Sequence, residues 1–263
     1  MKKLGKIYLG LVLLFLYVPI FVLIVFSFNE SKSRSVFSGF TLDWYKKLFQ
    51  NDIIISSLVN TLIIAVAASI ISTILGTLAA IGINNMRKVP KAIVMNITNM
   101  PIINPEIVTG VSLMLLFVFF AARMNLEFGF VTLLIAHITF DVPYVILNIM
   151  PKFRQMDPHL YEAAQDLGCS PFNAFMKVVL PEIMPGVVSG FLMAFTYSLD
   201  DFVISYFTSG STSQTLPVTI YSMTRRKVSP EINALSTIIF AVVVIILIVK
   251  NVIETRQLKK REA

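Results

Sequence analysis

Four carboxylates lie in or beside long apolar stretches of the sequence: Glu106, Asp141, Asp200 and Asp201. A charged side chain at the centre of a membrane helix costs about 2.5–3.5 kcal/mol even on the most lenient insertion scale. We therefore expect these acids to face the interior of a helix bundle or a wet cavity. The stretches that carry them contain no Lys or Arg that could pair with them. Fixed negative charge without an internal counter-ion suits a path for a cation.

Aromatic and hydroxyl side chains accompany these acids. If residues 184–207 form one helix, Tyr197 and Ser205 each lie four residues from Asp201 and share its face, whereas Asp200 points about 100° away. Tyr144 follows Asp141 by three residues and shares its face. Aromatic faces attract ammonium groups by about 0.5–2 kcal/mol. The predicted substrate path consists of Asp200, Asp201, Glu106, Tyr197, Ser205 and Asp141.

Each acid also has a structural interpretation. Asp200 and Asp201 could form a hydrogen-bond site between helices near the outer end of their span. Glu106 follows Pro105, and Asp141 precedes Pro143. At both places a carboxylate could accept hydrogen bonds from backbone donors that a proline leaves free. Both interpretations of each acid stay open at the level of the sequence.

The elements that would position these acids are membrane helices. Hydrophobic residues make up 56% of the 263 residues and charged residues 14%, against about 25% charged in soluble domains. A helix needs about 20 apolar residues to cross the hydrocarbon core. The first apolar run is too long for a signal peptide, so we expect it to be retained. The sequence predicts an all-α membrane protein with six spans: Ile7–Phe28, Leu58–Ile83, Met100–Ala122, Phe130–Met150, Met184–Phe207 and Ala234–Val252.

The distribution of Lys and Arg predicts the orientation. With the N-terminus inside, the inner segments hold 14 basic residues and the outer segments 8, which favours cytoplasmic termini. The outer segment 29–57 has aromatic residues spaced for an amphipathic helix at the membrane interface, with Trp44 and Tyr45 at headgroup depth. The outer segment 208–233 begins with Ser, Thr and Gly, which is typical of a flexible loop.

The cytoplasmic segment 151–183 carries the signals of a helical hairpin. Asp157 with Pro158 predicts the start of a first helix, and Ser170 with Pro171 the start of a second. Gly168 between them suits the left-handed residue that ends a helix. Pro181 and Pro185 are expected to end the second helix before the fifth span begins.

The residues Glu162-Ala163-Ala164, then Gly168, then Leu180-Pro181 resemble the EAA loop of ABC-importer permeases. The resemblance implies a six-span permease of MetI-like architecture, one domain over residues 1–263 with a coupling hairpin at about 154–183. In that family the loop docks on a separate ATPase subunit. The resemblance makes Glu162, Ala163, Ala164, Gly168, Leu180 and Pro181 the ATPase-coupling residues.

Further stretches resemble the polyamine branch of these permeases, the PotC-type subunits of spermidine/putrescine importers. They are Phe40–Tyr45, Asn104–Val108, Ser198–Ser205, Leu216–Met223 and Val228–Leu235, and Glu106 departs from the pattern because aspartate is expected there. The resemblance implies a multi-pass protein of the bacterial cytoplasmic (inner) membrane that transports polyamines and is not an enzyme. Its implied partners are a second permease subunit, two ATPase subunits, an extracytoplasmic substrate-binding protein and the substrate.

Several functions are disfavoured by the sequence. The chain lacks a G-x-x-x-x-G-K-[ST] stretch, so no cofactor is expected in it, and ATP with Mg belongs on the partner ATPase. The single cysteine and two distant histidines, His137 and His159, do not suggest a metal site. The net charge of +7 comes from clusters that flank apolar runs, which suits membrane anchoring better than nucleic-acid binding.

Three alternatives keep a membrane setting. A permease for another substrate remains open, and an ion-coupled secondary carrier could also use intramembrane acids without needing the hairpin. An intramembrane aspartyl protease would need two carboxylates that share a proton. Its Gly-x-Gly-Asp context is missing, since Leu199 precedes Asp200.

Overall fold

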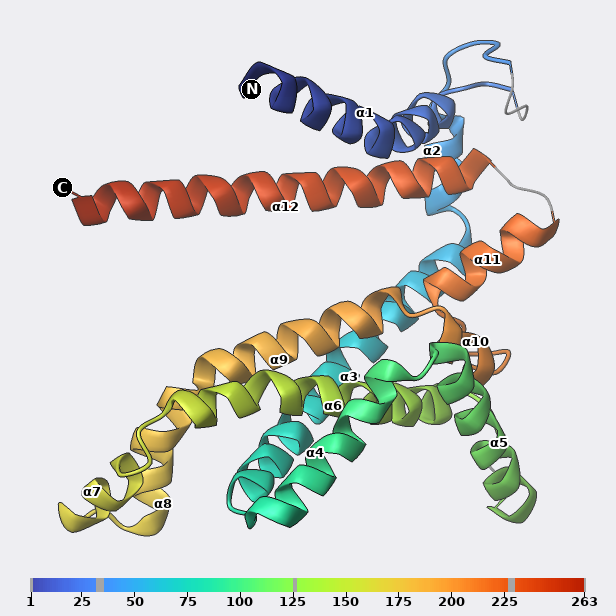
Figure 1. The fold of residues 1–263 in the computed structure, drawn as a ribbon. Coiled ribbons are helices and arrows are strands. Elements are labelled where there is room, and N and C mark those ends of the chain that lie inside the picture. The colour runs from blue at the N-terminus through green and yellow to red at the C-terminus, as the bar shows by residue number, and fades with distance from the viewer. Residues whose placement is uncertain (1, 32–35, 125–126, 227–229, 263) are drawn as a thin grey trace. The chain divides into compact units, whose positions relative to one another are not determined.

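The computed structural model describes residues 2–31, 36–124, 127–226 and 230–262, which form helices joined by short connections (Figure 1). Within these ranges no strand forms, and Asn29 and Phe40 make an isolated bridge. The elements are α1 Lys2–Ser27, α2 Asp43–Phe49, α3 Asp52–Asn84, α4 Lys88–Ile103, α5 Glu106–Met124, α6 Phe130–Gln155, α7 Leu160–Asp166, α8 Pro171–Ala174, the π-helix η1 Phe175–Val179, α9 Leu180–Asp200, α10 Val203–Thr208, α11 Leu216–Arg226 and α12 Pro230–Glu262.

Five helices are long and apolar enough to cross a membrane: Gly5–Ser27, Asp52–Asn84, Glu106–Arg123, Phe130–Gln155 and Pro171–Asp200. They correspond to the first five predicted spans. The sixth predicted span, Ala234–Val252, lies in α12. Its described apolar part, Pro230–Ile245, is shorter than a span, and most side chains beyond it fall outside the described residues.

The third predicted span begins in the wrong place. Residues 100–103 belong to α4, a helix that the sequence analysis did not predict, and the membrane helix starts at Glu106. Asn104 is extended, with ψ 137°. Pro105 lacks an N–H and disfavours the helical conformation of the residue before it, so the helix breaks at this pair.

Two further boundaries differ from the predictions. The predicted helix Met184–Phe207 is interrupted, because α9 ends at Asp200 and α10 begins at Val203. Pro181 and Pro185, in turn, do not end the second hairpin helix. The chain passes from α8 through η1 into α9 without a break, and the Leu180 N–H bonds the Phe175 carbonyl five residues earlier. This wider turn leaves room for the Pro181 ring, which an α-helical turn would press against a carbonyl.

The chain divides into two compact units, Met1–Ile55 with Ile220–Ala263, and Ser56–Thr219. In the first, α12 packs on α1 and α2. Trp44 is buried there and its Nε1 donates to the Asn29 carbonyl at 2.7 Å, while the Tyr45 hydroxyl and Ser27 Oγ lie 2.7 Å apart. The predicted interfacial helix exists as α2, but its Trp44 is covered by protein. The segment predicted as a flexible outer loop, 208–233, contains α11.

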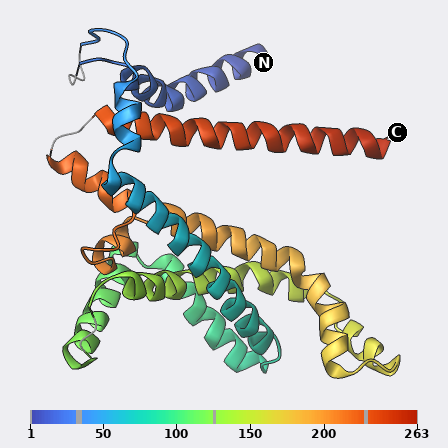
Figure 2. The ribbon, with the colours of Figure 1, turned by 180° about the vertical axis from the view of Figure 1, so that it is seen from behind.

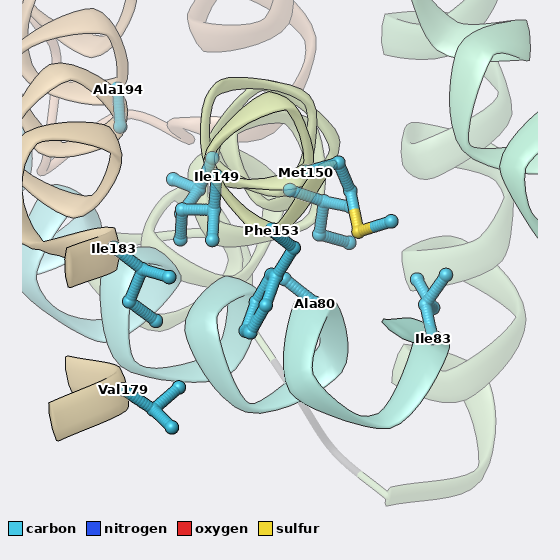
Figure 3. Close-up of a cluster of buried hydrophobic side chains, with 10 residues drawn as sticks. Ala80, Ile83, Ile149, Met150, Phe153, Val179, Ile183 and Ala194 are labelled. Atoms are coloured by element: carbon cyan, nitrogen blue, oxygen red, sulfur yellow. The ribbon is translucent and has the colours of Figure 1, made fainter. Parts of the chain in front are cut away.

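In the second unit, α9 lies along α6 (Figures 1 and 2). Gly186 and Gly190 allow this approach, since a Cβ on Gly186 would meet the Asn148 carbonyl at 2.9 Å and one on Gly190 would meet Val145 at 3.2 Å. Small residues at a membrane helix interface let the backbones pack closely. Beside this contact a buried apolar cluster joins α3, α6, η1 and α9 (Figure 3), with Ala80, Ile149, Phe153, Val179 and Ile183 among its members.

Hydroxyl side chains of α3 bond to their own helix. Thr73 and Thr77 donate at 2.6 Å to carbonyls four residues earlier, and Ser72 donates to the Ala68 carbonyl. Such bonds satisfy the hydroxyl where no water is available. Near its N-terminal end α3 is tied to the start of α11, since the Leu216 N–H donates to Thr61 Oγ1 at 2.7 Å. The fold class is therefore an all-α membrane protein, and the single permease domain stays a prediction.

Candidate functional site

The break between α9 and α10 is built by Asp201. Its backbone leaves the helical conformation, with ψ 124°. Its carboxylate accepts the N–H of Ile204 at 3.2 Å and the N–H of Ser205 at 2.7 Å. These are the unpaired donors of the first turn of α10, so Asp201 caps that helix. Asp201 was predicted on the substrate path. In the structure it makes these two capping hydrogen bonds, and the residue is 8% exposed.

His137 ties α6 to both sides of the break. Its Nδ1 shares a hydrogen bond with Ser198 of α9 at 2.6 Å, and its Nε2 shares one with Ser205 of α10 at 3.0 Å. Nε2 also lies 3.6 Å from Oδ2 of Asp201. All four side chains are buried. The sequence analysis considered His137 only as a candidate metal ligand and did not place it in the site, although its spacing of four from Asp141 was a signal that both face the same interior.

Asp200 and Asp201 point to different surroundings. Asp200 is exposed at the end of α9, while Asp201 is buried. The two neighbours therefore separate into one carboxylate open to the outside of the subunit and one used in the α9–α10 corner. Tyr197, Asp201 and Ser205 do not share one helical face, because the helix on which that prediction depended ends at Asp200.

A tyrosine pair lies one turn from Asp200. The rings of Tyr144 on α6 and Tyr197 on α9 have centroids 4.4 Å apart, and Phe140 packs edge-on to both. Both tyrosines are half-buried, so part of each ring faces out of the packed core. The structure thus brings together Tyr197 and Tyr144, as an aromatic surface that could bind an ammonium group.

Glu106 occupies the first turn of α5 and is exposed. One turn later, Gly110 packs against α10, where a Cβ would meet the Phe207 ring at 3.0 Å. Glu106 is thereby held on a helix that packs on α10, the short helix that Asp201 caps. Its side chain is exposed, so the structural interpretation of Glu106, in which the carboxylate accepts from backbone donors freed by a proline, gains no support.

Asp141 lies close to the midpoint of α6 and is fully buried. Neither of its carboxylate oxygens has a hydrogen-bond partner among the described residues. The alternative in which Asp141 satisfies a donor freed by Pro143 is therefore wrong. Its role on the substrate path stays a prediction.

The hairpin predicted in segment 151–183 forms much as expected. Gly168 is left-handed, with φ +88°, and Cys169 N–H donates to the Ala164 carbonyl at 3.1 Å. Ser170 accepts the Asn173 N–H at 3.4 Å and caps α8. α7 begins at Leu160, later than predicted, because Asp157 caps a preceding turn through the His159 N–H at 2.9 Å.

The hairpin presents a surface that suits a partner. The Glu162 side chain is 74% exposed, and Ala163 beside it is exposed too, while Ala164 packs inward. Leu167 is 87% exposed and Phe172 71%, which is unusual for large apolar residues outside lipid. A cavity of about 520 Å³ lies under the hairpin, lined among others by Asn84, Phe153, Tyr161, Glu162 and Phe175.

Among the described residues no group of three His, Cys, Asp or Glu side chains could hold a metal ion. The candidate site has two separate parts, one before α9 and one after it. One part is the exposed hairpin that precedes it. The other is the corner that follows it, with its acids and tyrosines.

Comparison with known proteins identifies the family of the chain. The model of the family described as "Binding-protein-dependent transport system inner membrane component" matches residues 72–257. The putrescine transport system permease protein PotI of Escherichia coli (strain K12) is 40% identical over 236 residues, covering 88% of this chain and 84% of that protein. The spermidine/putrescine transport system permease protein PotC of the same strain is 37% identical over 239 residues, covering 91% and 89%.

Solved structures share the fold. A chain of a bacterial ABC transporter involved in the import of the acidic polysaccharide alginate superposes with a TM-score of 0.70 at 14% identity, covering 97% of this chain and 95% of that one. A chain of an amino acid ABC transporter gives a TM-score of 0.52 at 21% identity, with coverage of 77% and 94%. The expectation of a transport subunit in place of an enzyme is confirmed, since the chain belongs to the family of inner-membrane components of binding-protein-dependent transport systems.

Proposed function

We propose that this chain is a permease subunit of an ATP-driven importer of putrescine or spermidine. The observation that carries the proposal is the exposed Asp200 next to the Tyr144–Tyr197 pair, on a chain 37–40% identical to two permeases named for these amines. A polyamine carries several ammonium groups joined by short alkyl links. A carboxylate replaces the water around an ammonium group, and aromatic rings attract both its charge and its alkyl part.

We place Asp200, Glu106 and Tyr197 on the path surface in direct reach of the substrate. Asp200 and Glu106 are exposed and Tyr197 is half-buried, so they need no rearrangement to meet a ligand. Asp201 and Ser205 act on the path through the α9–α10 corner that they hold together. Binding must stay weak enough for release, and separated acids on different helices meet that requirement better than a closed cage.

The hairpin α7–α8 is the proposed contact with a separate ATPase. Glu162 and Ala163 are exposed beside the apolar Leu167, and the second hairpin helix continues into α9. Motion of the hairpin can therefore reach Asp200 along one helix. A second permease subunit would complete the path, and an extracytoplasmic binding protein would deliver the substrate to the outer side.

Uptake of labelled amine tests the proposed function directly. Cells that contain the importer with this chain should accumulate putrescine or spermidine, and cells that lack only this chain should not. Accumulation should stop when the catalytic site of the ATPase subunit is inactivated, because no P-loop is present here to supply the energy. Equal accumulation with and without the chain, or uptake of a different substrate class alone, would refute the polyamine assignment.

Cysteine labelling tests the proposed orientation, with both termini in the cytoplasm. Gln50 and Ser211 are exposed in segments placed outside, and Cys169 lies in the hairpin placed inside. In a Cys169→Ser background, Gln50→Cys and Ser211→Cys should react with an impermeant thiol reagent in spheroplasts. The unmodified chain should react through Cys169 only after lysis. The reverse pattern would invert the topology.

A further inference from the structure

Asp141 is an acid without a counterpart in the packed core. It is 0% exposed, and neither oxygen is hydrogen-bonded by any described residue. An ionised carboxylate in a medium of low dielectric constant is costly unless a proton or a cation neutralises it. A protonated acid would still need an acceptor for its O–H, and none lies within hydrogen-bond distance. The contacts of the subunit alone therefore satisfy neither form.

Small residues of α9 and α3 pack against the part of α6 that carries Asp141. α6 and α9 are antiparallel, and Gly190 lies against Val145 while Ser198 bonds His137. The same register places Ala194 across from Asp141, and Ala194 provides only a methyl group. On α3, a Cβ on Gly76 would meet Val145 and the Val142 carbonyl of α6, and Ser72, one turn earlier on α3, is buried. The Ser72 hydroxyl already donates to the Ala68 carbonyl.

The titratable groups near Asp141 do not neutralise it. His137, one turn earlier on α6, shares its two ring nitrogens with Ser198 and Ser205 and lies 3.6 Å from Asp201. Asp201 on the α9–α10 corner adds a second carboxylate, and the phenols of Tyr144 and Tyr197 cannot carry positive charge. Among the described residues of this unit, the buried acids and bases are thus two aspartates and one imidazole, without a Lys or Arg.

We propose that Asp141 binds one ammonium group of the transported amine in an occluded state, after the amine has left Asp200. Substrate sites of transporters lie near the bilayer midplane beside interrupted helices, and Asp141 is near the midpoint of α6 opposite the helix that breaks at Asp201. The Tyr144–Tyr197 pair, one turn from Asp141, covers this buried site. Separation of the two rings gives the amine access to the Asp141 carboxylate from the tyrosine-lined surface. This inference rests on the proposed function and assigns a second, buried binding step to it.

Asp141→Asn provides the test, because asparagine has the shape of a protonated aspartate without its negative charge. The importer with its ATPase and binding protein is placed in lipid nanodiscs and proteoliposomes, and spermidine-stimulated ATP hydrolysis and spermidine uptake are both measured. We expect uptake to fall tenfold or more while the stimulated hydrolysis stays within about twofold of the unsubstituted protein. The number of amines moved per ATP therefore falls. Asp141→Glu, which keeps the charge, should recover part of the uptake.

The control is Thr132→Val on the same helix, which removes a buried hydrogen bond to the Thr208 carbonyl without changing charge. If Thr132→Val lowers either activity, it should lower uptake and ATP hydrolysis together. Unchanged uptake in Asp141→Asn would mean that the acid carries a proton, and would overturn the inference. An equal loss of uptake and hydrolysis, or failure of Asp141→Asn to assemble with the ATPase, would make the acid structural and overturn it as well. If the unsubstituted importer moves no polyamine, the proposed function itself fails, independently of Asp141.

Discussion

Gly168→Val should reduce amine uptake by tenfold or more and lower the recovery of the ATPase with the permease. Gly168 has φ +88°, where a residue with a Cβ is strained by about 1–2 kcal/mol and a β-branched residue by more. The valine variant would relieve this strain by reopening the turn, which would turn α8 away from α7. The exposed Glu162 and Leu167 would then no longer form one surface with Phe172. Copurification of the ATPase with the tagged permease, followed by uptake assays, measures both effects.

Gly168→Asn is the matched control for this prediction. Asparagine tolerates the left-handed conformation better than other residues, and a Cβ at this position meets nothing within 4 Å. It should therefore keep ATPase recovery and uptake close to those of the unsubstituted chain. Loss of function in both variants would show that the surface of the turn matters and its backbone does not. Full function of the valine variant would remove the hairpin from the coupling mechanism.

Asp200→Asn should lower polyamine uptake by about ten- to a hundredfold without lowering the amount of assembled importer. A charge-assisted hydrogen bond is worth about 1.5–3 kcal/mol, and each 1.36 kcal/mol lost at the limiting step is about tenfold in rate. Asp200 is exposed at the end of α9, so asparagine costs the fold little. Glu106→Gln should act in the same direction. Initial uptake rates, normalised to the subunit level on immunoblots, give the comparison.

Two neighbouring variants separate a path effect from a structural one. Glu182→Gln alters an exposed acid about five turns earlier on the same membrane helix, and uptake should stay unchanged. Asp201→Asn should lower thermal stability along with uptake, since Ile204 and Ser205 donate to different oxygens of the carboxylate and asparagine replaces one of these oxygens with an NH2 donor. Wild-type uptake in Asp200→Asn and Glu106→Gln together would show that these exposed acids do not serve the substrate.

The sequence was informative where the physical signal is local. Apolar length predicts the first five spans, and the sequence of Ser170, Pro171 and Gly168 predicts the hairpin, because caps and left-handed turns depend on a few adjacent residues. The break at Asn104-Pro105 also has a local signal, which the apolar run obscured. The interruption after Asp200 has a local signal too, because Asp201 is an aspartate that caps the next helix through the Ser205 N–H four residues later, but the apolar residues around it favoured one continuous span.

The candidate site was predictable in its residue types and not in its arrangement. Acids in apolar stretches mark an interior surface, but the separation of Asp200 from Asp201 into exposed and buried positions follows from the broken helix. The role of His137 depends on Ser198 and Ser205, which are 61 and 68 positions away. Contacts over such separations come from tertiary packing, which a periodicity of 3.6 residues does not describe.

The π-turn Phe175–Val179 fixes the angular phase between the hairpin and α9. Each residue of an α-helix turns the chain by about 100° and advances it by 1.5 Å, so the wide turn changes which direction every later side chain of α9 faces. The hairpin and the corner at Asp200 are thus joined by one continuous helix, with a fixed angle between the directions that their side chains face. In the proposed coupling, a tilt of the hairpin would rotate α9 about its axis and so change the direction in which Asp200 faces at its far end.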